Sequence, residues 1–228
     1  MGSKNRHSRE LLPIILNKRY QEQYYVEPFV GGCNMIDKVD GNRIGNDINE
    51  YLIYMWNCVS GGWLPRYDYT EDQYKYIRDN KDEDKCLTGY FGFALSYGGK
   101  FFGGWCRDSA NKRNYVLEAY KNAVNQFPLL NGVKFYNNHY VNFTKLIPYK
   151  SIIYCDPPYA NTTKYKNDFD HNLFWDWCNY LVDCGHSVFV SEYNAPLNWT
   201  SVWQKRVTSS LTKNTGSKIA VEKLFTRK

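Results

Sequence analysis

The organisation of the chain becomes clear from one short segment, residues 151–159, whose sequence is SIIYCDPPY. Its first five residues are apolar or β-prone, and the run is too short for a helix, so it predicts a buried strand. Pro157 and Pro158 end that strand because neither can donate a hydrogen bond to a sheet ladder. The segment therefore predicts a stiff turn at the carboxyl end of a strand, which is where ligands bind in open α/β sheets.

This turn presents three groups to a ligand: the Asp156 carboxylate, the Pro157 carbonyl oxygen and the Tyr159 ring. The two acceptors suit an exocyclic amine on a base, whose lone pair is delocalised into the ring. If they hold both N–H bonds out of the ring plane, the lone pair localises and attacks an electrophilic methyl group, while Tyr159 stacks on the base. The alternative is that Asp156 only caps a turn that the prolines stiffen.

The composition narrows the class of protein. The 228 residues suffice for one large α/β domain, and a net charge of +6 with 18% aromatic residues is compatible with a polyanionic partner and with base stacking. No apolar run reaches membrane-spanning length and no signal peptide precedes the first charges, so we expect a cytoplasmic protein without membrane contact. The seven cysteines are scattered and contain no Cys-x-x-Cys pair, so we expect neither disulfides nor a metal site.

A second candidate binding segment lies earlier in the chain. Residues 24–29 predict a short strand, and the pair Gly31 and Gly32 after it predicts a tight turn that a ligand can approach closely. The next predicted strand, residues 42–46, ends at Asp47, an acid placed like those that bind ribose hydroxyls in nucleoside-binding α/β folds. The alternative is that Asp47 caps the helix predicted after it.

Residues 63–138 interrupt the alternation of strands and helices. Within them, residues 89–107 interleave glycines with aromatics and are followed by cations. This combination suits nucleic-acid contact, and an aromatic core around glycine turns is an equal alternative. Cations here, and in the polar loop after Tyr159, are expected to contact phosphates, with solvated surface charge as the alternative. The candidate phosphate-binding residues are Lys100, Arg107, Lys112, Arg113 and Lys164.

The two ends of the chain carry further predictions. Ser8 is placed to cap the first helix, in which Pro13 is expected to bend the helix or delay its start. Residues 202–208 and 219–225 predict a hairpin with many cations and a single acid, Glu222. Those cations either protect a sheet edge or contact a DNA backbone.

Four short motifs occur in order along the chain: residues 2–4 (GSK), 27–32 (EPFVGG), 46–49 (NDIN) and 156–159 (DPPY). Together they resemble the Dam-like, D12-class DNA adenine-N6 methyltransferases of bacteria and their phages. The resemblance covers nearly the whole chain, since residues 214–218 (NTGSK) also look like the family's C-terminal end.

The resemblance implies a fold and a reaction. The implied fold is the Rossmann-like α/β sandwich of S-adenosylmethionine-dependent methyltransferases, with a catalytic domain over residues 1–60 and 139–228. A mostly helical target-recognition segment is inserted at residues 61–138. The implied reaction moves a methyl group from S-adenosylmethionine to adenine N6 in double-stranded DNA by base flipping, without a metal. The implied location is the cytoplasm of a bacterium or of a phage-infected cell.

The resemblance also implies a role for each motif. Lys4 contacts the methionine end of the cofactor, Asp47 its ribose hydroxyls and Ile48 its adenine. Phe29 and the turn at Gly31 and Gly32 pack along the cofactor, and Asp156 faces it. The implied catalytic residues, which hold the target adenine, are Asp156, Pro157, Pro158 and Tyr159.

Two alternatives to this function remain open. The same planar-amine chemistry serves RNA adenine, cytosine N4 or a protein amide as the methyl acceptor. The family's turn often reads Gly-x-Gly, whereas Cys33 follows Gly32 here, so we expect a different backbone path at this point. That change also permits a DNA-binding protein that has lost catalysis.

Overall fold

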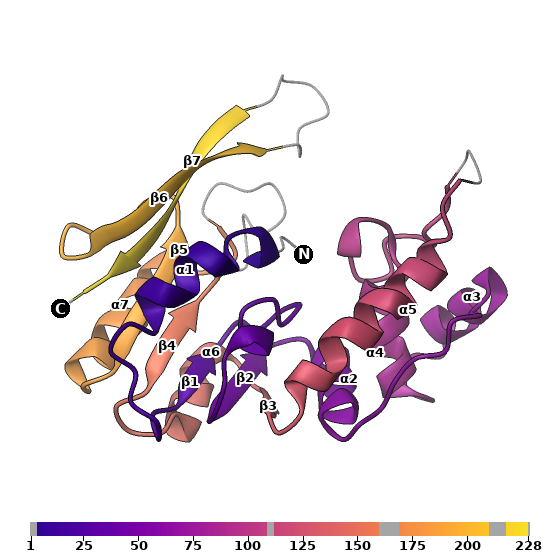
Figure 1. Cartoon of the computed structure of the whole chain (residues 1–228), viewed down its shortest axis with the longest axis horizontal. Coiled ribbons are helices and arrows are strands. Elements are labelled where there is room, and N and C mark those ends of the chain that lie inside the picture. Colours follow the sequence, from indigo (N-terminus) through magenta and orange to yellow (C-terminus); the bar gives the residue numbers. More distant parts are fainter. Residues whose placement is uncertain (1–3, 109–111, 160–168, 210–217, 228) are drawn as a thin grey trace.

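A seven-stranded sheet organises the computed structural model, which describes residues 4–108, 112–159, 169–209 and 218–227 (Figure 1). The strand order is β3-β2-β1-β4-β5-β7-β6. The strands from β3 to β5 run parallel, β7 is antiparallel to β5, and β6 is antiparallel to β7. The strands are β1 (Tyr25–Glu27), β2 (Arg43–Asp47), β3 (Lys134–Asn137), β4 (Ile152–Cys155), β5 (Ser187–Glu192), β6 (Thr200–Ser209) and β7 (Lys218–Thr226).

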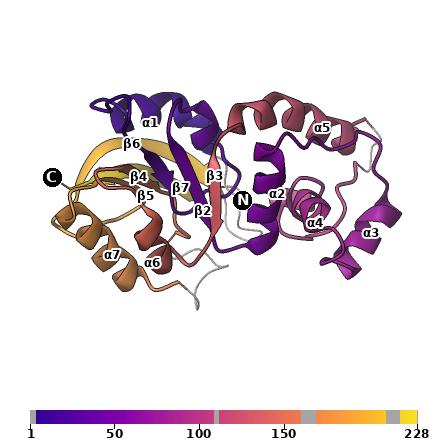
Figure 2. The ribbon, with the colours of Figure 1, turned by 90° about the horizontal axis from the view of Figure 1, so that it is seen from below.

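Helices cover both faces of the sheet, as a mainly parallel sheet requires. Figure 2 shows α1 (Ser8–Ile15) over one face, and α6 (Tyr140–Phe143) and α7 (His171–Asp183) over the other. Each face has its own buried cluster, and the neighbouring β4 residues Ile153 and Tyr154 belong to different clusters because side chains alternate along a strand. The predicted α/β sandwich is confirmed. Among the described residues, no helix has the length and apolar character needed to cross a membrane.

A helical lobe lies beside the edge strand β3 (Figures 1 and 2). It consists of α3 (Glu71–Asp79), α4 (Lys85–Phe93) and α5 (Tyr115–Gln126). The lobe falls within the insert predicted at residues 61–138. The predicted end of that insert is too late, however, because Lys134–Asn137 pair with β2 and so belong to the sheet.

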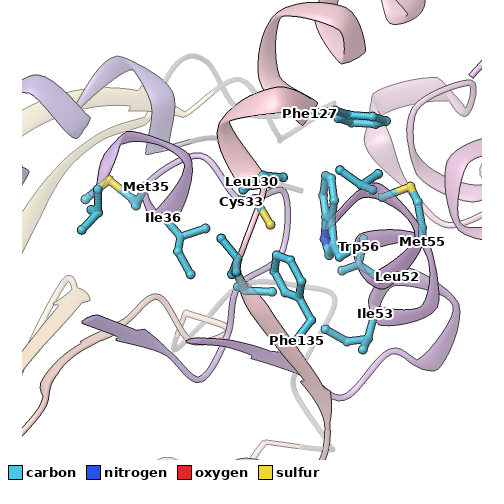
Figure 3. Packing of buried hydrophobic residues seen from close by; sticks show 14 of the residues in the cluster. Cys33, Met35, Ile36, Leu52, Ile53, Met55, Trp56, Phe127, Leu130 and Phe135 are labelled. Carbon is cyan, nitrogen blue, oxygen red and sulfur yellow. The ribbon is translucent and has the colours of Figure 1, made fainter. Parts of the chain in front are cut away.

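The lobe packs on the sheet domain through α2 (Glu50–Ser60), which follows β2. Figure 3 shows Trp56 of α2 between Phe135 of β3 and Phe127, with ring centroids 6.2 Å and 5.7 Å away. On its other side α2 contacts α4 closely enough that a Cβ on Gly89 would lie 2.3 Å from the carbonyl oxygen of Tyr51. A glycine is therefore required for the approach of these two helices.

The segment 89–107 is mainly a packing segment. Tyr90 and Phe91 of α4 are fully buried, and Trp105 packs against the buried ring of Tyr74 at 5.4 Å between centroids. Tyr97, by contrast, is 68% exposed. The sequence left open either nucleic-acid contact or an aromatic core for this segment. For these rings, the aromatic core is the correct interpretation.

The first helix differs from the prediction. Ser8 is the first residue of α1 rather than its cap, and its hydroxyl donates to the carbonyl oxygen of Asn5 at 2.9 Å. Pro13 lies inside α1 and does not delay its start. A proline leaves the carbonyl four residues earlier without its helical partner, and here that residue, Arg9, is exposed to water.

The C-terminal hairpin and the 3-10 helices complete the described elements. The predicted C-terminal hairpin is confirmed as β6 and β7. The 3-10 helices of the described residues are η1 (Lys4–Arg6), η2 (Ile36–Lys38), η3 (Tyr97–Gly99), η4 (Phe127–Leu130) and η5 (Thr144–Leu146).

Candidate active site

Three ionisable side chains meet at the carboxyl edge of the parallel strands. Asp156 follows β4, Lys4 lies in η1, and Glu222 lies in β7. The Lys4 ammonium is 2.9 Å from Asp156 Oδ1 and 3.0 Å from Glu222 Oε1. The side chains of Lys4 and Glu222 are 10% and 8% exposed, whereas that of Asp156 is 23% exposed. The lysine and the glutamate are thus buried behind an aspartate that solvent reaches.

The electrostatics of this cluster keep Lys4 charged. Burial alone would lower the pKa of Lys4, but the charges of Asp156 and Glu222 and their hydrogen bonds outweigh it and raise the pKa above the ordinary lysine value. Lys4 therefore remains a cation between two carboxylates.

Tyr159 completes the cluster through its hydroxyl. Lys4 donates a hydrogen bond to this hydroxyl, which in turn donates to Glu222 Oε1 at 3.4 Å. Burial, together with the charges of Asp156 and Glu222, raises the pKa of Tyr159 well above its ordinary value, so the hydroxyl keeps its proton. The ring packs against Tyr193 at 5.0 Å between centroids. Stacking of Tyr159 on a base remains a prediction.

The glycine turn after β1 is bound to the end of β2. The Gly31 N–H donates to Asp47 Oδ2 at 3.1 Å, and the Asn49 N–H donates to Asp47 Oδ1 at 3.0 Å. The helix cap of α2 is Asn49 and not Asp47, because the Asn49 side chain accepts from the Leu52 N–H. Burial raises the pKa of Asp47, while the backbone hydrogen bonds oppose that shift.

The backbone path at the turn explains its unusual sequence. Gly31 has φ 47° and Cys33 has φ 56°, both in the left-handed region, whereas Gly32 does not. Cys33 is fully buried, so it takes a conformation that glycine usually provides while adding its side chain to the core.

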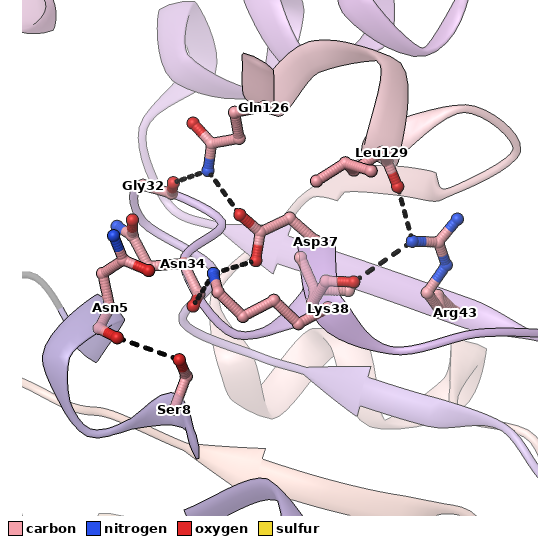
Figure 4. Close-up of polar contacts among 10 residues, drawn as sticks. Asn5, Ser8, Gly32, Asn34, Asp37, Lys38, Arg43, Gln126 and Leu129 are labelled. Carbon is pink, nitrogen blue, oxygen red and sulfur yellow. Dashed lines mark hydrogen bonds and ion pairs between the residues drawn. The ribbon is translucent and has the colours of Figure 1, made fainter. Parts of the chain in front are cut away.

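One residue of the lobe, Gln126, and one residue of the sheet domain, Asp37, hold the glycine turn in place. Gln126 of α5 donates to the Gly32 carbonyl oxygen at 2.9 Å and to Asp37 Oδ2 at 3.1 Å, as Figure 4 shows. Asp37 in turn accepts from Lys38 at 2.7 Å. Neither Gln126 nor Asp37 was identified from the sequence, because their partners lie far away along the chain.

The other residues predicted for the cofactor differ in their surroundings. Ile48 follows β2 and is 67% exposed, which leaves its side chain available to a ligand. Phe29 instead packs among aromatic rings, with Tyr140 at 5.4 Å and Phe174 at 5.7 Å between centroids. Pro157 is buried and Pro158 half-buried beside Asp156.

Glu27, the last residue of β1, is an acid that the sequence patterns did not single out as a site residue. It is 3% exposed, and its Oε1 has no hydrogen-bond partner among the described residues. Burial raises the pKa of Glu27 well above its ordinary value, so the site favours the uncharged form of this carboxyl. The sequence feature that could have identified Glu27 is an acid in an otherwise buried strand, immediately before Pro28.

Four of the predicted phosphate-binding cations, Lys100, Arg107, Lys112 and Arg113, lie on the lobe and not at the active site. Arg107 pairs with Glu71, and Arg113 pairs with Glu118 at 2.6 Å. Lys100 and Lys112 are exposed, and Lys164 lies outside the described residues. Arg107 also lines a surface cavity of about 390 Å³ with Lys75, Arg78 and Trp105. Contact of these cations with nucleic acid remains a prediction.

Comparison with known proteins gives one sequence match. Residues 1–91 match the model of the D12 class N6 adenine-specific DNA methyltransferases, which confirms the resemblance over the part of the chain that holds the first three of the four motifs. This match covers η1, the glycine turn, Asp47 and the start of the lobe. A search of curated protein sequences found no significant match.

Solved structures with similar topology include candidate methyltransferases. The candidate methylase HI0767 from Haemophilus influenzae is 12% identical at a TM-score of 0.43, with 98% of each chain covered. The candidate methyltransferase yhhF from Escherichia coli is 14% identical at a TM-score of 0.39, with 97% of this chain and 86% of that chain covered.

Proposed function

With the match to the D12 class as the premise, we propose that this methyltransferase transfers a methyl group from S-adenosylmethionine to N6 of an adenine in double-stranded DNA. The observation that carries the proposal is the position of Asp156. Its carboxylate stands at the carboxyl edge of β4, partly open to solvent and paired with a buried lysine, instead of pointing into packed core.

The described residues fit the proposed cofactor. Asp47 accepts two backbone N–H groups, and because each carboxylate oxygen has two lone pairs, both can also accept from ribose hydroxyls. Ile48 offers an exposed apolar side chain to an adenine ring. Lys4 and Asp156 supply one cation and one anion for the two charged ends of an amino acid.

The turn after β4 supplies the chemistry for the acceptor. The Asp156 carboxylate and the Pro157 carbonyl oxygen accept the two N–H bonds of an exocyclic amine and localise its lone pair. When bound, S-adenosylmethionine would supply a methyl group on a sulfonium, and transfer to this amine would leave both electrons of the carbon–sulfur bond on sulfur as the carbon–nitrogen bond forms. Asp156 is also available to accept the proton that the methylated amine releases. The protein thus acts mainly by positioning the reactants.

The lobe is the proposed DNA-contacting part of the protein. Its exposed cations, Lys100, Arg107, Lys112 and Arg113, suit backbone phosphates, and the surface ion pairs of Arg107 and Arg113 are weak enough to be exchanged for a phosphate. Flipping the adenine out of the duplex costs a few kcal/mol, which hydrogen bonds from the turn and stacking on Tyr159 offset.

The test is methyl transfer to defined duplexes, followed by nucleoside analysis. Purified protein, radiolabelled S-adenosylmethionine and duplexes that together contain all short sequences should yield N6-methyladenine. Asp156→Ala should abolish the product, whereas Asp176→Ala, the same change on the exposed side of α7, should retain it. N4-methylcytosine as the only product, or transfer only to RNA or to a protein when these are offered in parallel reactions, would replace the proposed acceptor. Absence of cofactor binding would favour a protein that has lost catalysis.

A further inference from the structure

We propose that Glu222 is a positioning residue that acts through Lys4 to keep one excess negative charge at the cofactor site. By this means the site prefers the cationic cofactor, a sulfonium, over its neutral thioether product. The inference rests on the function proposed above and concerns a residue outside the matched motifs.

The first argument is the hydrogen bonding of Lys4. An ammonium has three N–H donors, and three oxygens surround this one: Asp156 Oδ1, Glu222 Oε1 and the Tyr159 hydroxyl. Glu222 is the more buried carboxylate and Asp156 the more exposed. Glu222 therefore pairs with Lys4 on the buried side of the cluster. Lys4 then neutralises Asp156 only in part, and the remaining negative charge of Asp156 faces the solvent-exposed side.

The second argument is the charge count. Lys4 contributes one positive charge, and Asp156 and Glu222 contribute two negative charges, so the cluster has a net charge of −1. Tyr159 keeps its proton, and burial raises the pKa of Glu27 and so favours its uncharged form. Lys205 is directly opposite Glu222 in the hairpin, but its ion pair with Glu10 cancels its charge. A sulfonium would neutralise the cluster, whereas a thioether would leave the negative charge unpaired.

The consequence differs for the two ligands. Without the Glu222 charge, Lys4 pairs with Asp156 alone, and the cluster becomes neutral. A unit charge several ångströms away in a partly buried site is worth enough to change sulfonium binding by about ten-fold. A neutral thioether has no such attraction to lose.

Calorimetry with both ligands tests the proposal. In Glu222→Gln the Kd for S-adenosylmethionine should rise about ten-fold, while that for S-adenosylhomocysteine changes less than about three-fold. Glu22→Gln makes the same change at an exposed position just before β1, away from the hairpin, and should change neither value. Equal weakening of both ligands in Glu222→Gln would overturn the proposal and leave Glu222 a structural residue.

Two further variants cover the case in which Glu222→Gln does not fold. Lys4→Met brings the cluster to −2 and should increase the preference for the sulfonium, even if both affinities fall. The double variant Lys4→Met with Glu222→Gln returns the cluster to −1 and should restore the wild-type preference. An unchanged preference in Lys4→Met would contradict the proposal. If the wild-type protein binds neither ligand, the proposed function fails instead.

Discussion

The side-chain amide of Gln126 donates a hydrogen bond to the carbonyl oxygen of Gly32, 2.9 Å away in space and 94 residues away in sequence. Gln126 is the last residue of α5, and Gly32 belongs to the glycine turn. The same amide also donates to the buried carboxylate of Asp37. The helical lobe, which is proposed to contact DNA, thus directly contacts the turn that is proposed to bind the cofactor.

Loss of this contact should loosen the turn. In Gln126→Ala the Gly32 carbonyl and the Asp37 carboxylate each lose a partner, so the free energy of unfolding should fall by about 1–3 kcal/mol. Affinity for S-adenosylmethionine should fall with it, as calorimetry can measure, while DNA affinity at fixed salt stays unchanged. Asn125→Ala alters a neighbouring exposed amide of α5 and is the matched control. Full cofactor affinity in Gln126→Ala would show that the contact does not support the turn.

Glu27 should make stability depend on pH. Burial raises the pKa of Glu27 well above its ordinary 4.5, so above pH 4.5 the folded chain holds a proton that the unfolded chain releases. The Glu27 contribution to stability is therefore complete below about pH 4.5 and is lost as the pH rises toward the raised value. Glu27→Gln removes this loss.

Urea unfolding of Glu27→Gln and the wild-type protein at a series of pH values measures the effect. The variant should gain stability relative to the wild type as the pH rises above about 4.5, by up to about 1.4 kcal/mol per pH unit, until the raised pKa of Glu27 is passed. Glu22→Gln makes the same change at an exposed position and serves as the control. Parallel curves for Glu27→Gln and the wild type would rule out a neutral buried carboxyl.

Gly89 and Gly92 should respond differently to alanine, although both lie in α4. A Cβ at Gly89 would lie 2.3 Å from the Tyr51 carbonyl oxygen, and backbone cannot move aside easily. A Cβ at Gly92 would meet the Phe101 ring at 2.4 Å, and that half-buried side chain can rotate. Gly89→Ala should therefore cost about 1–3 kcal/mol of unfolding free energy and Gly92→Ala less, as measured by thermal or urea denaturation. A larger loss in Gly92→Ala would contradict this order.

Arg107 and Arg113 should contribute to the salt dependence of DNA binding. If each contacts a phosphate, Arg107→Gln or Arg113→Gln should weaken binding to all duplexes alike and reduce the slope of log K against log salt by about 1. Lys18→Gln removes an exposed cation from the segment between α1 and β1, outside the lobe, and should leave the slope unchanged. An unchanged slope in both arginine variants would indicate that their carboxylate partners keep them from DNA.

The sequence predicted those parts of the site that depend on local chemistry. The strand and turn at residues 151–159, the acid Asp47 after a strand, and the C-terminal hairpin all follow from short-range patterns. The contact between Lys4 and Glu222 did not follow, because it joins the two ends of the chain through the position of β7 in the sheet. The aromatic segment at 89–107 was ambiguous for a similar reason, since burial against Tyr74 is decided by tertiary packing.

The order of the strands has a consequence for how the protein is made. β7 lies between β5 and β6, although it leaves the ribosome after both of them. A nascent chain that has reached β6 still lacks the strand that bridges this hairpin to the sheet, and it also lacks Glu222. Lys4 and Asp156 therefore await their third partner until β7 has been synthesised, so the proposed catalytic edge forms only after every other strand of the described sheet has been made.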